Sequence, residues 1–151
     1  MRVLTEARRL AAAGCAATMI AGAVAPAASA ATTITIPVTA DLIGRVAVEM
    51  PVTVTCGPFD IYSLIGDVQV SQAAGQNIAQ AAGGFFGQAG FAVSGGVLCD
   101  GSPQTVTVSM NANSAGPPFH NGPAVASASA FVFSGLTSET ATDGPKTIRL
   151  R

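Results

Sequence analysis

His120 is the residue whose type best suits catalysis, because an imidazole can accept and donate protons near neutral pH. A nucleophilic triad also needs a serine or cysteine beside the histidine and an acidic partner to orient it. His120 is the only histidine, and it lies in a Pro/Gly/Asn segment, 117–122, with no acidic residue nearby in the sequence. No Gly-x-Ser-x-Gly motif occurs in the chain. The sequence therefore predicts no catalytic residue.

The acidic residues and cysteines predict neither a metal site nor a cofactor site. No His-x-x-x-His or Cys-x-x-Cys pair occurs, and the aspartates are scattered singly rather than clustered as in a calcium loop. No phosphate-binding glycine motif lies between a strand and a helix. A cryptic hydrolase that uses scattered carboxylates or His120 stays open as an alternative, because carboxylates separated in sequence can pair in space.

The segment Gly83–Gly96 holds the first group of candidate binding residues. It interleaves six glycines with Phe85, Phe86 and Phe91. These rings either form an exposed apolar surface for a ligand or partner, or they close one end of a hydrophobic core that has few other large side chains. The second alternative is the favoured one, since phenylalanine is among the residues most often buried.

The loop Pro117–Gly122 is the second candidate binding segment. Phe119 and His120 are its candidate contacts. The simpler interpretation is a plain connection between strands, because loops rich in proline, glycine and asparagine often serve only that purpose.

All these residues must be positioned by β-strands, because alternation of apolar and polar residues recurs along the chain. The alternation is longest over Val46–Cys56, where every second residue is apolar, and it predicts a strand that buries one face and organises the fold. Pro51 in that strand favours a bulge or an incompletely paired edge. Further strands are expected at 33–39, 67–71, 91–99, 105–110, 124–133 and 147–151.

Turn signals separate these strands. Residues 74–77 are expected to close a hairpin into 78–82, with a short helix over 71–82 as the weaker alternative. Asp100-Gly101 predicts a tight turn, and Asp41–Gly44 another. We expect loops at 111–123 and 134–145, little regular structure over 83–96, and a bulge near Phe131.

The first thirty residues are typical of a secretory signal peptide. A positive start with Arg8 and Arg9 precedes an apolar stretch, Leu10–Val24, and Ala28-Ser29-Ala30 matches a cleavage site. We expect a secreted protein whose mature form, 31–151, is a single domain without a stable membrane anchor. The general secretory and twin-arginine routes both stay open.

Loss of Cys15 with the signal peptide would leave two cysteines, Cys56 and Cys99. An even count in an exported chain predicts a disulfide between them. Residues 31–151 contain four basic and seven acidic residues, a net charge of about −3. That balance offers no basic patch for nucleic acid.

The motifs Pro51–Cys56 (P-V-T-V-T-C), Cys99–Gly101 (C-D-G) and Thr105–Val108 (T-V-T-V) resemble those of small secreted immunoglobulin-like β-sandwich proteins of actinobacteria. The chain is more distantly similar to neocarzinostatin-type chromophore carriers. Together with the strand pattern, the resemblance implies an all-β, immunoglobulin-like β-sandwich of seven or eight antiparallel strands with one disulfide.

Three classes of function follow from the absence of a catalytic set and from the resemblance. The leading class is a secreted non-enzymatic binding or surface-interaction domain, whose partner is an extracellular protein or a small hydrophobic ligand; a small-molecule carrier of the neocarzinostatin type is an alternative form of this binding class. The second class is a secreted protease inhibitor that presents a loop such as Asn111–Gly122. The cryptic hydrolase is the third class.

Overall fold

The computed structural model describes residues 30–89 and 96–151, and the regular structure of these residues is entirely β. The predicted signal peptide, apart from Ala30, lies outside the described residues. The strands are β1 (Ala30–Thr35), β2 (Thr39–Ile43), β3 (Ala47–Gly57), β4 (Ser63–Ala74), β5 (Asn77–Gln88), β6 (Gln104–Ala112), β7 (Gly122–Ser134) and β8 (Thr137–Leu150).

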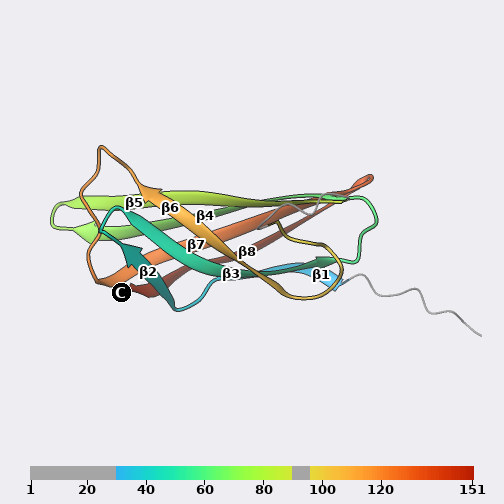
Figure 1. The fold of residues 1–151 in the computed structure, drawn as a ribbon, viewed down its shortest axis with the longest axis horizontal. Coiled ribbons are helices and arrows are strands. Elements are labelled where there is room, and N and C mark those ends of the chain that lie inside the picture. The colour runs from blue at the N-terminus through green and yellow to red at the C-terminus, as the bar shows by residue number, and fades with distance from the viewer. Residues whose placement is uncertain (1–29, 90–95) are drawn as a thin grey trace, which may run out of the picture.

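The sheet closes into a barrel of seven strands, so the predicted immunoglobulin-like sandwich is wrong (Figure 1). The ring runs β3-β2-β8-β7-β4-β5-β6, and β6 pairs with β3 to close it, while β1 pairs with β3 alone. The ring also depends on β2, where the sequence predicted a turn, Asp41–Gly44, instead of a strand. It pairs with β3 on one side and in parallel with β8 on the other, where Thr39 lies opposite Arg149. Closure gives every strand of the ring a neighbour on both sides, although β5 and β6 are paired only over two residues each.

The prediction for the organising strand is confirmed. Val48, Met50, Val52, Val54 and Cys56 of β3 are all fully buried inside the barrel, whereas Val46, which was expected on the same face, lies before β3 and is 62% exposed. Each second side chain of a strand points to the same face, so one alternating run supplies a continuous stripe of core.

Pro51 lies where β3 changes its neighbour. On one side β2 pairs with residues 47–49 and β1 with residues 53–57, so the proline falls between the two ladders. Proline cannot donate a backbone hydrogen bond, and this gap in the pairing accommodates it. The predicted incompletely paired position is therefore confirmed, although the expected single strand 33–39 is in fact β1 and β2 on either side of a short link.

The hairpin predicted at 74–77 is confirmed. Ala74 of β4 lies opposite Asn77 of β5, and Gly75 takes the positive φ (66°) that the two-residue turn requires. The irregular structure expected from Gly83 onward is wrong as far as Gln88, since β5 continues to that residue. Cross-strand packing explains this, because the ring of Phe85 covers Gly66 directly opposite and leaves no room for a side chain there.

The strand β7 keeps one inward face along its whole length, so the predicted bulge near Phe131 is wrong. Ala126, Ala128, Ala130 and Val132 are all buried. The irregularity lies in β8 instead, where an extra residue at 144–145 is accommodated opposite Ser127. The predicted loop 134–145 is also wrong, because most of it belongs to β8.

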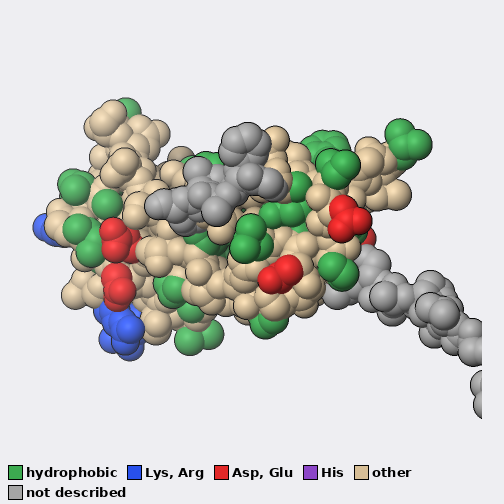
Figure 2. All heavy atoms as spheres, turned by 45° about the vertical axis from the view of Figure 1, so that its right-hand side comes forward, with side chains coloured by type: hydrophobic (Ala, Val, Ile, Leu, Met, Phe, Trp, Pro, Cys, Tyr) green, Lys and Arg blue, Asp and Glu red, His purple; other side chains and the backbone are tan. Residues whose placement is uncertain are grey.

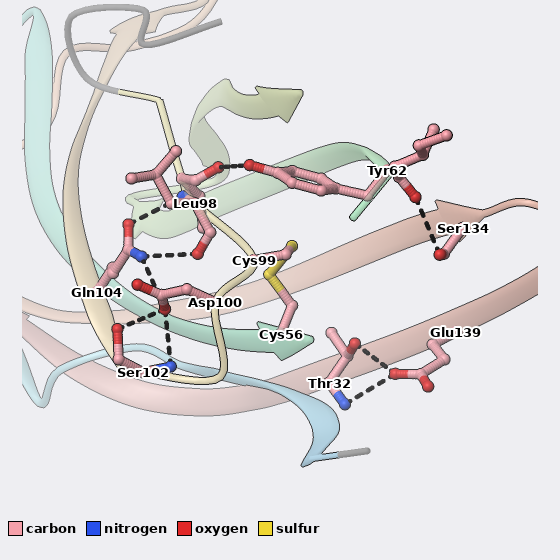
Figure 3. Close-up of a disulfide and its surroundings, with 12 residues drawn as sticks. Thr32, Cys56, Tyr62, Leu98, Cys99, Asp100, Ser102, Gln104, Ser134 and Glu139 are labelled. Atoms are coloured by element: carbon pink, nitrogen blue, oxygen red, sulfur yellow. Dashed lines mark hydrogen bonds between the residues drawn. A yellow bond between two sulfur atoms is a disulfide. The ribbon is translucent and has the colours of Figure 1, made fainter. Parts of the chain in front are cut away.

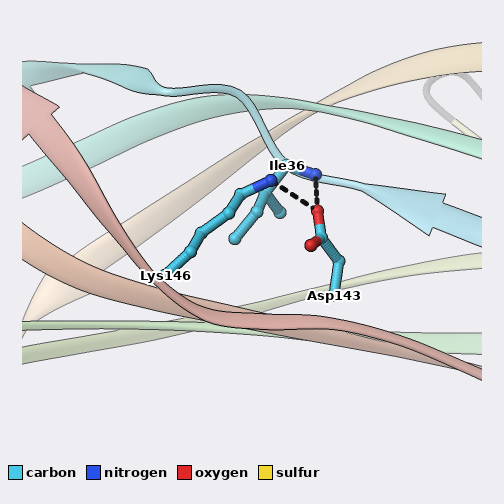
Figure 4. A network of polar contacts seen from close by, with 3 residues as sticks. All are labelled: Ile36, Asp143 and Lys146. Carbon is cyan, nitrogen blue, oxygen red and sulfur yellow. Dashed lines mark hydrogen bonds and ion pairs between the residues drawn. The ribbon is translucent and has the colours of Figure 1, made fainter.

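β1 pairs with β3 through its backbone, but its contact with β8 is made by carboxylate side chains of β8. Glu139 Oε2 accepts hydrogen bonds from both the backbone N–H (3.0 Å) and the hydroxyl of Thr32. Asp143 Oδ2 accepts a 2.7 Å hydrogen bond from the Ile36 N–H and another of 2.7 Å from Lys146 Nζ (Figure 4). Thr32 is buried although it is polar, and its two hydrogen bonds satisfy it.

The disulfide Cys56–Cys99 is confirmed, and it ties an irregular segment, 96–103, to the end of β3 (Figure 3). Backbone pairing between β5 and β6 covers only residues 81–82 and 111–112, so the two strands diverge beyond it. The irregular segment lies in this opening: Val97 N–H donates to the Phe86 carbonyl, and Gln104 bonds both backbone groups of Leu98. Residues 96–99 are not a strand, contrary to prediction, so the chain bends at Asp100-Gly101, where the Asp100 carboxylate accepts from the Ser102 N–H, but the predicted tight turn does not join two strands.

Candidate functional site

The two neighbouring phenylalanines of β5 point to opposite faces of the barrel wall. Phe85 is buried in the core and packs over Gly66, whereas Phe86 is 56% exposed. Phe91 lies outside the described residues. Of the two alternatives left open by the sequence, Phe85 therefore follows the core interpretation and Phe86 the surface interpretation.

Phe86 belongs to an apolar row on the outer face of the sheet. Ile65 lies opposite Phe86 on one side and opposite Phe131 on the other, which places the three side chains in register across β5, β4 and β7. The ring of Phe133 packs edge-to-face against that of Phe131, with centroids 4.4 Å apart. Ile65 and Phe133 are exposed, so the row is open to solvent.

Phe119 closes one end of the barrel and is fully buried, so its side chain is part of the core. Two hydrogen bonds with Arg45 hold its backbone: the Phe119 N–H donates to the Arg45 carbonyl (3.1 Å), and the Phe119 carbonyl accepts from the side-chain Nε of Arg45 (3.0 Å). The loop 113–121 that carries it lies at the same end of the molecule as the β4–β5 turn (Figure 1).

His120 is exposed, but both ring nitrogens lie against backbone carbonyls. Nδ1 is 3.1 Å from the Asn121 oxygen, and Nε2 is 3.1 Å from the Ala73 oxygen. A neutral ring has one N–H, so it can donate to only one of these carbonyls at a time. The geometry suits a residue that attaches the loop to β4.

Three of the acidic residues that make hydrogen bonds, Glu139, Asp143 and Asp100, support backbone structure. Glu139 and Asp143 hold β1, as described above. Asp100 accepts from the hydroxyl and backbone N–H of Ser102, and these hydrogen bonds lower the pKa of its carboxyl. Within residues 30–89 and 96–151, no group of three or more His, Cys, Asp or Glu could hold a metal ion.

A hollow of about 650 Å³ forms a groove on the outer face of the barrel wall. Its central row is in register across four strands: Ser127 lies opposite Gln69, Gln69 opposite Ala82, and Ala82 opposite Asn111. Ser71 and Gln80, also paired with each other, form the next row. The remaining lining includes Asn113, Val125 and Pro145.

A second hollow of about 310 Å³ continues the groove across β7 and β8, because Gln69 and Ser127 line both. Asp67, Ser129 and Thr142 line this continuation. We call the two hollows together the outer groove. It crosses five strands, and the apolar row of Phe86, Ile65 and Phe131 lies two residues beyond its Asp67 end.

The outer groove is polar and almost uncharged. No Lys or Arg lines it, and Asp67 is the one charged residue of its lining. On the face drawn in Figure 2, charged side chains are few, and those of Lys and Arg gather at one end of the molecule. Among the described residues, no hydrogen bond engages the side chains of Ser71, Gln80, Asn111 or Ser127, which leaves their donors and acceptors available.

Sequence reasoning missed the polar residues that β4, β5 and β7 contribute to this groove, although it named Asn111 and Asn113 within the loop Asn111–Gly122. The signal was present, since Gln69, Ser71 and Ser127 occupy the polar positions of predicted strands. What it could not reveal was that β4 lies between β5 and β7, because strand order depends on pairing between distant segments.

The disulfide is typical of proteins from oxidising compartments. In the described part of the chain, we find no helix with the length and apolar character to span a membrane.

Neither a protein-family model nor a curated protein matches this chain. The similarity to secreted actinobacterial sandwich proteins and to chromophore carriers therefore stays a prediction, and the closed barrel departs from the sandwich that both imply.

Proposed function

We propose that this protein is a secreted, non-enzymatic binding domain and that the outer groove is its binding surface. The observation that carries the proposal is the group of four hydroxyl and amide side chains without hydrogen bonds among the described residues, Ser71, Gln80, Asn111 and Ser127, which strand pairing gathers in a hollow of about 650 Å³. Binding sites commonly have this volume and present a few convergent polar groups.

Two features favour the groove over the other candidate surfaces. The loop 113–121, which a protease inhibitor would present, turns its largest side chain, Phe119, into the core. A carrier of hydrophobic molecules would need a cavity inside the barrel. Packed side chains, among them Met50, Met110 and Leu64, fill the interior instead.

Secretion is part of the proposal. The signal-like first thirty residues and the disulfide Cys56–Cys99 both support it.

The test is to fill the groove with one substitution. Ala82 is exposed at the centre of the groove, so Ala82→Arg should block it without disturbing the core. Ser138→Arg is the matched control, because it adds the same side chain to an exposed position of β8 outside the outer groove. Binding of the purified protein and both variants is measured by calorimetry against neutral oligosaccharides, casein-derived peptides and an apolar fluorescent dye.

We expect Ala82→Arg to weaken binding of one probe class at least tenfold and Ser138→Arg to leave it unchanged. Equal binding by all three proteins, or no binding of any probe, contradicts the groove as a binding surface. Stoichiometric inhibition of subtilisin or trypsin would instead support the inhibitor alternative.

A further inference from the structure

We infer that the outer groove binds a neutral oligosaccharide, an inference that rests on the proposed binding function. The chemistry of the lining selects this class of ligand. Amide and hydroxyl groups each offer both a donor and an acceptor, and so does every hydroxyl of a sugar. Gln80 and Asn111 stand on neighbouring strands, and Ser71 and Ser127 lie on the other side of the groove, so one sugar ring can meet several of them at once.

Charge argues against the ionic classes of ligand. An anionic polymer requires Lys or Arg to replace its counterions, and neither lines the groove. A cationic ligand would find a single carboxylate, Asp67, at one end, and that carboxylate already accepts a 3.1 Å hydrogen bond from Gln69 Nε2. A neutral ligand loses less hydration free energy than an ion when it leaves water for such a surface.

The backbone of the groove argues against an extended peptide. Peptides that bind sheets commonly add a strand to a free edge. Both edges of β4, which runs through the groove, are already paired, with β5 and with β7. Along β4, only side chains are therefore offered to the ligand. The groove also lacks the alternating apolar pockets by which peptide side chains are selected, since its exposed apolar residues in the larger hollow are Ala82, Val125 and Pro145.

The apolar row beyond Asp67 suits the apolar face of a sugar ring. A pyranose ring has hydroxyls around its edge and an aliphatic C–H face that packs on apolar side chains. Phe86 and Phe131 lie two residues along their strands from Gly84 and Ser129, which flank Asp67 in the neighbouring row. A chain of sugars that leaves the Asp67 end of the groove would therefore place its next ring over this row. A ligand with only polar groups would gain nothing from it.

The experiment titrates the purified protein with cello-, laminari- and chito-oligosaccharides, which are neutral, and in parallel with alginate oligomers and casein-derived peptides. The readout is the NMR signal of the side-chain NH₂ groups of Gln69, Gln80, Asn111 and Asn113. At least one neutral oligosaccharide should shift these signals, and alginate oligomers should not.

Isosteric variants then identify the contacts. Gln80→Glu and Asn111→Asp keep shape but remove the NH₂ donors, so each should weaken oligosaccharide binding about tenfold, the loss expected for one unmade hydrogen bond of about 1.4 kcal/mol. Gln76→Glu, the same change in the exposed β4–β5 turn, is the control and should have no effect. Phe86→Ala should weaken the longer oligosaccharides more than the disaccharides.

The outcomes separate this inference from the proposed function. If peptides or alginate shift the groove signals and neutral oligosaccharides do not, the ligand class is wrong while the groove stays a binding surface. If no probe shifts these signals and Ala82→Arg changes nothing, both proposals are wrong. Oligosaccharide binding that Gln80→Glu and Asn111→Asp leave intact would also overturn the inference.

Discussion

The buried side-chain amide of Gln72 makes a reciprocal pair of hydrogen bonds with the backbone of His120. Gln72 Oε1 accepts from the His120 N–H at 2.9 Å, and Gln72 Nε2 donates to the His120 carbonyl at 2.8 Å and to the Pro123 carbonyl at 3.1 Å. Gln72 is only 2% exposed. A polar side chain inside the barrel thus holds the loop that brings Phe119 into the core.

Replacement of this amide should destabilise the protein. Gln72→Leu leaves backbone groups of His120 and Pro123 without partners, and each unsatisfied buried group costs about 1–3 kcal/mol, so we expect a loss of about 2–4 kcal/mol. Gln69→Leu, the same change on the outer face of β4, should alter stability by less than about 0.5 kcal/mol. Urea denaturation measures both, and equal losses would mean that Gln72 does not hold the loop.

The adjacent phenylalanines of β5 should differ sharply in their contribution to stability. Phe85→Ala empties a buried site and uncovers Gly66, so it should cost about 3–5 kcal/mol. Phe86→Ala removes an exposed ring and should cost less than about 1 kcal/mol. Thermal melts of the two variants check the difference. A large loss at Phe86 would show that the apolar row is needed for folding and is not a free surface.

Asp143 of β8 accepts hydrogen bonds from Lys146 and from the N–H of Ile36, the residue after β1. We call this arrangement the clamp, and it should make the stability of the protein depend on pH in acid. Burial favours the neutral form of Asp143, but hydrogen bonds from Lys146 and the Ile36 N–H, with the charge of Lys146, outweigh it and hold the pKa of Asp143 below its ordinary value of 3.8. A carboxyl whose pKa is lowered by folding stabilises the protein above its ordinary pKa. That contribution is lost as the pH falls through the folded pKa.

We therefore expect the free energy of unfolding to fall as the pH drops below about 3.8, and to fall less steeply in Asp143→Asn. Asp60→Asn is the control, because Asp60 is exposed and makes no hydrogen bond among the described residues. Denaturant melts between pH 2 and pH 6 provide the measurement. Parallel pH profiles for the wild type and Asp143→Asn would rule out this role for the clamp.

The disulfide should contribute substantially to stability. Cys56 and Cys99 are separated by 43 residues, and closing a loop of that length stabilises by roughly 4 kcal/mol in the chain-entropy model. The double variant Cys56→Ser/Cys99→Ser should therefore melt at a markedly lower temperature. Mass spectrometry after alkylation without reductant should find neither thiol modified, and modification of both would show that the bridge does not form.

The sequence by itself determined which residues of several strands face the core. In β3 from Val48 to Cys56, in β6 at Val108 and Met110, and in β7 from Ala124 to Val132, the buried residues are apolar and occur at every second position, although Val125, Phe131 and Phe133 of β7 are apolar residues on the outer face. The hairpin at Gly75 and the pairing of Cys56 with Cys99 were also predictable, because turn chemistry and an even cysteine count are local or countable signals.

Only the tertiary structure decided how these strands are joined. A sandwich and a barrel show the same alternation, and the difference lies in the pairing of β2 with β8, two segments at opposite ends of the domain. Only the tertiary structure also decided which phenylalanine side chains are buried. Phe119 is in a loop of the sequence but is buried in the core, whereas Phe86, next to the buried Phe85, is on the surface. The outer groove exists because pairing aligns Ser127, Gln69 and Asn111 on one face, and no local pattern carries that alignment.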